Sequence, residues 1–200
     1  MKKTALIFGG AALLALTVSP AFAQQANTGS PDPSIAQRKD NQQDRIANGI
    51  ESGQLTADET KNLETKEAGL NKEESNMRAE DNGHLSAADR AKLDNQQNRL
   101  SHQIYDDKHN ANTAHYGNNE VGQRRQNQQD RIAQGVKSGQ LTAGETAKLE
   151  RQQQSINRED RSMRAADGGK LTAADKARLN QRQNNASKNI YAKKHNSQAR

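Results

Sequence analysis

Large apolar residues are sparse along this chain, and within its polar stretches they often stand seven residues apart. Leu63, Leu70 and Met77 follow this spacing, as do Leu93 and Leu100. Seven-residue spacing keeps side chains on one face of an α-helix, whereas no segment alternates apolar and polar residues like a β-strand. The pattern therefore predicts an all-α protein. The six expected helices lie near residues 36–50, 57–79, 87–108, 122–136, 143–165 and 173–195.

The expected helices belong to two copies of one sequence unit. Residues 41–109 align without a gap to residues 127–195, and roughly 38 of about 69 positions are identical. Each copy accounts for three of the six expected helices. We therefore predict a tandem duplication of a three-helix unit.

The first 23 residues differ from the rest of the chain. Lys2 and Lys3 precede an apolar run that ends in Ala21-Phe22-Ala23, a pattern typical of a cleavable signal peptide. The run is shorter than the roughly 20 residues of a transmembrane helix. We expect a periplasmic or secreted mature protein without a transmembrane segment, beginning near Gln24. The expected organisation is a signal peptide at 1–23, a disordered lead-in at 24–35, a first repeat at 36–109, a linker at 110–121 and a second repeat at 122–196.

One eight-residue motif occurs four times at the expected helix boundaries. It reads SGQLTADE at residue 52 and returns as NGHLSAAD, SGQLTAGE and GGKLTAAD. The glycine can end one helix in the left-handed conformation, and the hydroxyl residue can form a capping box with the acid three positions later. The predicted boxes are Thr56–Glu59, Ser86–Asp89, Thr142–Glu145 and Thr172–Asp175.

The second of these turns resembles an EF-hand calcium loop. With Gly83 at loop position six, oxygen ligands for Ca²⁺ would come from Glu80, Asn82, Ser86 and Asp89. Position one, however, is the cation Arg78. Two interpretations stay open: a degenerate calcium-binding loop, or a helix hairpin closed by a glycine and a capping box.

A second candidate metal site lies on the third expected helix. His102, Asp106 and His109 are spaced so that one helix face can present all three, and imidazole with carboxylate suits Zn²⁺, Cu²⁺ or Ni²⁺. The second copy has Lys188, Ala192 and His195 at these places. The alternative is an ordinary polar helix face.

The segment LTADE, residues 55–59, resembles the LTxxQ motif of the Spy/CpxP periplasmic proteins, although its fifth residue is Glu rather than Gln. This resemblance implies a helical, exported, chaperone-like or stress-associated protein. The repeat pattern also resembles that of exported helical-repeat proteins of Gram-negative bacteria.

Charge divides the chain into unlike halves. Residues 24–122 carry a net charge of roughly −6, and residues 123–200 carry roughly +10. We expect a protein partner, self-association through the oppositely charged halves, or contact with an anionic envelope surface. The shortage of aromatic residues argues against nucleic acid. Because no enzyme motif is present, the sequence predicts a non-catalytic exported binding protein that needs no cofactor, with divalent metal binding as the alternative.

Overall fold

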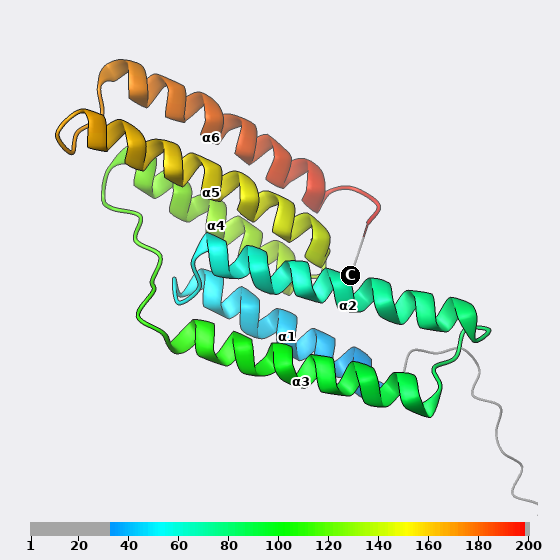
Figure 1. Ribbon diagram of the computed structural model, residues 1–200. Coiled ribbons are helices and arrows are strands. Elements are labelled where there is room, and N and C mark those ends of the chain that lie inside the picture. The colour runs from blue at the N-terminus through cyan, green and yellow to red at the C-terminus, as the bar shows by residue number, and fades with distance from the viewer. Residues whose placement is uncertain (1–32, 199–200) are drawn as a thin grey trace, which may run out of the picture.

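The computed structural model describes residues 33–198 of the 200-residue chain. The predicted signal peptide and most of the predicted lead-in lie outside these residues. The described residues form six α-helices and no β-strand, which confirms the all-α class (Figure 1). None of these helices is both long and apolar enough to cross a membrane. They are α1 (Pro33–Glu51), α2 (Ala57–Glu80), α3 (Ala87–His109), α4 (Glu120–Lys137), α5 (Ala143–Ala166) and α6 (Ala173–Lys194).

The first helix starts earlier than predicted, so residues 33–35 are helical rather than part of a disordered lead-in. Proline is tolerated at Pro33 because the first N–H groups of a helix have no intrahelical acceptor. Ile35 is almost fully buried and packs with Leu85 and Leu93. The side-chain amide of Gln97 also donates to the Ile35 carbonyl at 3.1 Å. These contacts hold the first turn of α1 in place.

All four predicted capping boxes are present. At the first of them, the Thr56 hydroxyl accepts from the Glu59 N–H at 3.3 Å, and the Glu59 carboxylate accepts from the Thr56 N–H at 2.9 Å. The glycines of the four turns have the predicted positive φ: Gly53, Gly83, Gly139 and Gly169. The repeated eight-residue motif therefore ends one helix and begins the next.

Helices α1–α3, here called the first unit, lie beside helices α4–α6, the second unit, and the two are offset along their length (Figure 1). The inner contacts join the units, because α2 packs against α5 and α1 packs against α4. Among the six described helices, the third helix of each unit, α3 or α6, packs only on the other two helices of its own unit.

The largest apolar cluster belongs to both units at once. It is lined by buried residues of α1, α2, α3, α4, α5 and α6 and by the two turn leucines, Leu55 and Leu141. A smaller cluster around Ile35 lies in the first unit, and another around Ile156 and Leu179 lies in the second. The units therefore share one central core within a single chain.

Glutamine and glutamate side chains are also buried in this interior. Gln43 donates its side-chain amide to the Glu64 carboxyl at 3.0 Å, and Gln129 donates to the Glu150 carboxyl at 2.9 Å. Gln42 and Gln128 reach the third helix of their own unit, at the carbonyls of Gln97 and Gln183. Hydrogen bonds of this kind offset the cost of burying the amides.

In each unit, the turn between the first two helices packs on a glycine that the sequence analysis did not single out. Leu55 folds back onto Gly49, and Leu141 folds back onto Gly135, and each leucine N–H donates to that glycine carbonyl. A β-carbon at either glycine would lie 2.6 Å from the leucine Cδ1. Because the leucines are fully buried, they have little room to move away.

Replacing the second of these glycines should destabilise the protein. We expect Gly135→Ala to lower the free energy of unfolding by about 1–3 kcal/mol, because overpacking outweighs the gain in helix propensity. Gly69→Ala is the control, since a β-carbon at Gly69 of α2 meets nothing within 4 Å. That change should instead stabilise the helix by about 0.5–1 kcal/mol. Chemical denaturation of both variants measures the difference, and equal effects would contradict the proposed packing of Leu141.

The buried acid Glu150 should make stability depend on pH. Burial raises its pKa to about 8, and the hydrogen bond from Gln129 only partly opposes this. Between the ordinary pKa near 4.5 and the raised value, the folded chain holds a proton that the unfolded chain has lost. The stabilising effect is therefore complete below pH 4.5 and disappears as pH rises through about 8.

We expect Glu150→Gln to remove this dependence, because the amide cannot ionise. From pH 5 to 8 the parent protein should lose up to roughly 1 kcal/mol per pH unit more than the variant. Urea unfolding at a series of pH values gives the difference curve. Parallel curves would show that Glu150 does not carry this proton.

Candidate functional site

A groove with four cationic side chains lies on the outer side of the seam between α2 and α5. Lys61 and Lys66 enter it from α2, and Arg151 and Arg158 enter it from α5. The other lining residues are neutral Asn, Thr and Gln, so the lining contains no carboxylate. We call this feature the seam groove. Its volume is about 610 Å³.

The charges in the seam groove are only partly neutralised. Lys61 lies 3.4 Å from the exposed carboxylate of Asp58, and Lys66 donates to the side-chain carbonyl of Gln103. Arg151 and Arg158 are exposed, and within residues 33–198 neither makes a hydrogen bond or an ion pair. Assembling like charges at a packed seam is unfavourable unless an anion binds there.

The two copies of the repeat diverge most along this seam. Between residues 61 and 70, only Leu63 and Glu64 are identical at the matching places in the second copy. Both are buried in the interior. The positions that match Arg151 and Arg158 are Thr65 and Lys72. The arginine pair is therefore a property of the second unit and not of the repeat.

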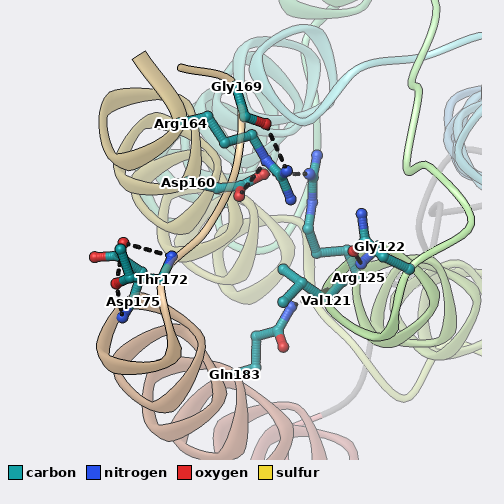
Figure 2. A network of polar contacts seen from close by, with 10 residues as sticks. Val121, Gly122, Arg125, Asp160, Arg164, Gly169, Thr172, Asp175 and Gln183 are labelled. Atoms are coloured by element: carbon teal, nitrogen blue, oxygen red, sulfur yellow. Dashed lines mark hydrogen bonds and ion pairs between the residues drawn. The ribbon is translucent and has the colours of Figure 1, made fainter. Parts of the chain in front are cut away.

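On the side of α5 that faces α4, a buried acid anchors the outer turn of the second unit. Figure 2 shows Arg125 of α4 and Arg164 of α5 converging on Asp160, at 3.5 and 2.9 Å. The Arg164 guanidinium also donates to the Gly169 carbonyl at 3.3 Å. Burial lowers the pKa of Arg125, and the charge of Asp160 opposes that effect. This network fixes the guanidinium of Arg125 near the linker.

The first unit has the same anchor at the turn that resembles an EF-hand. Arg78 binds the Glu74 carboxylate at 2.9 Å and donates to the Gly83 carbonyl at 3.2 Å. The cation at loop position one is thus a structural contact within the turn. This contact explains why both copies place arginine where a calcium loop needs an acid.

The predicted calcium ligands are placed around this turn with other partners. Asp89 is held by the capping box, and hydrogen bonds from the Ser86 side chain and backbone lower its pKa. Glu80 and Asn82 are exposed, and Asn82 has a positive φ of 51°. The Glu80–Asp89 site stays a prediction.

The predicted histidine face is exposed on α3. His109 stacks on Tyr105, with ring centroids 4.1 Å apart, and its Nδ1 lies 2.6 Å from the Tyr105 carbonyl oxygen. His102 and Asp106 lie on the solvent side of the same helix. In the part of the chain that the structure describes, no three His, Asp or Glu side chains are grouped to hold a metal. This metal site also stays a prediction.

The sequence reasoning missed the seam groove because it counted charge over whole halves. The positions of Arg151 and Arg158, seven residues apart, were a usable signal for one helix face. The contribution of Lys61 and Lys66 was not predictable, since it depends on α2 lying beside α5.

Comparison with protein-family models, curated proteins and solved structures gives no match. The assignment of function therefore rests on the geometry of this chain.

The turn at Gly83 gives a direct test of the two interpretations. We expect Ser86→Ala to cost about 0.5–2 kcal/mol through loss of the cap, and to cost the same with and without millimolar Ca²⁺. Thr172→Ala, at the cap that matches Ser86 in the second copy, is the matched control and should behave alike. A melting temperature that rises with Ca²⁺, and no longer rises in Asp89→Ala, would instead support the calcium loop.

Proposed function

We propose that this chain is a non-catalytic exported binding protein whose seam groove holds an anionic partner, with the phosphate-bearing surface of the bacterial envelope as the best candidate. The observation that carries the proposal is the pair of unpaired arginines, Arg151 and Arg158, beside two lysines in a groove without carboxylates. Guanidinium groups suit phosphate because their donors match two oxygens at once.

The composition of the groove supports binding rather than catalysis. Its lining offers cations and neutral amide and hydroxyl groups, but no histidine or carboxylate that could act as a general base. The arginines are also solvent-exposed, so they can meet an extended surface as well as a small anion. An exported protein of positive net charge would encounter such a surface directly.

Binding to lipid vesicles tests this function. We expect the mature protein to co-sediment with vesicles containing phosphatidylglycerol, and not with vesicles of phosphatidylcholine alone. Arg151→Gln/Arg158→Gln should weaken binding about 10- to 30-fold at low salt, since each cation near an anionic surface contributes about 1 kcal/mol. Raising the salt concentration should weaken binding by the parent protein.

The matched control is Lys176→Gln/Lys188→Gln on α6, which removes the same charge from two exposed positions of the same unit. It should retain most of the binding. Equal losses in the two double variants would mean that net charge alone attracts the protein, and this result would overturn the assignment to the seam groove.

A further inference from the structure

A second hollow, of about 590 Å³, lies under the linker between α3 and α4. Its roof is the linker segment 111–116, and its walls are the first turn of α2 and the facing sides of α4 and α5. We call it the linker cleft. Its volume falls within the range of small-molecule sites.

The roof of the linker cleft is fixed at both ends. The Ala114 N–H donates to the Gly53 carbonyl at 2.8 Å, and Asn112 donates to the Glu59 carboxylate at 3.0 Å. Further along, the Tyr116 ring lies beneath the Arg125 guanidinium, 5.6 Å from ring centroid to Cζ. Because these contacts exist without a ligand, little ordering would be needed on binding.

Three polar side chains in a row on α5 line the cleft without partners. Gln154 is only 7% exposed, and within residues 33–198 it makes no hydrogen bond. The Oδ1 atom of Asn157 is buried and accepts no hydrogen bond. Arg161 forms no ion pair in the described residues. Buried amides normally have hydrogen-bond partners, so the amide of Gln154 is free to bind a ligand in the cleft, and Arg161, which is exposed, offers an unpaired positive charge.

The two sides of the linker cleft carry opposite charge. Arg125 and Arg161 stand on the side formed by α4 and α5, and Asp58 and Glu59 stand at the start of α2. The Glu59 oxygens already accept hydrogen bonds from the cap and from the linker. Asp58, which is exposed and contacts only Lys61 through its carboxylate, is the acid that remains accessible.

The cleft exists at one end of the α2–α5 seam because the two copies differ there. At the opposite end, Gly144 and Ala68 allow the helices to meet, with a β-carbon on Gly144 only 4.0 Å from that of Ala68. The residues that match them in the repeat are Asp58 and Gln154, and both line the cleft. Where the opposite end of the seam has two small residues, the end with the hollow has two polar ones.

We infer that the linker cleft binds a zwitterionic small molecule of the amino-acid or short-peptide class. Its carboxylate would lie toward Arg161 and Arg125, and its ammonium group would lie toward Asp58. A ligand with one charge would satisfy only one side of the cleft. The linker cleft shares Gln154 with the seam groove, but the two have no charged residue in common, so its test does not depend on the anionic partner proposed above.

Blocked and unblocked peptides test this inference on the mature protein. Isothermal titration with trialanine should show binding at least tenfold tighter than with N-acetyl-trialanine or with trialanine amide, because each blocked form loses one charge. Similar affinity for all three peptides, or no heat of binding for trialanine at millimolar concentration, would overturn the proposal.

Two variants assign the ends of the ligand. Arg161→Gln should weaken the binding of trialanine at least tenfold but leave the already weak binding of the amide unchanged. Asp58→Asn should show the converse pattern, with the acetylated peptide unaffected. The control is Arg158→Gln, which removes an arginine of the seam groove from the same helix and should leave trialanine binding intact. A loss in the control as large as that in Arg161→Gln would contradict the assignment to the linker cleft.

Discussion

The packing of α2 against α5 decides the rest of this structure, because the chain has too few large apolar residues for two separate cores. Full burial of one leucine or isoleucine contributes roughly 1.5–3 kcal/mol, whereas a helix cap contributes about 1 kcal/mol. The capping boxes therefore set where helices begin and end, while the shared central cluster supplies most of the stabilisation. The two units dock through an apolar contact at the centre of their interface, although the two halves of the chain differ in net charge.

Buried glutamines make this packing specific. Gln42, Gln43, Gln128 and Gln129 donate to carboxyl or carbonyl oxygens of other helices in their own units. A helix that slid or rotated by one residue would leave these amides buried without acceptors, at a cost of about 1–3 kcal/mol each. Polar side chains thus fix the register of helices that a thin apolar stripe would leave loosely defined.

The same seam produces both candidate binding features, and each depends on a difference between the copies. Arginine replaces threonine and lysine along the seam groove, and Asp58 with Gln154 replaces the close contact of Gly144 with Ala68. Residues that hold the fold, such as Leu63 and Glu64, are identical in both copies. The candidate binding residues of this chain therefore lie at positions where the two copies of the repeat differ.

The sequence by itself determined the helices and their caps, because these features depend on residues only a few positions apart. It did not determine that Gln129 and Glu150 are buried, or that Lys61 lies near Arg151 across a seam. Considered from the sequence alone, polar side chains such as these are expected to be exposed to solvent. Only the tertiary structure decided them, since the approach of α2 to α5 depends on the summed packing of both units and brings together residues far apart in the chain.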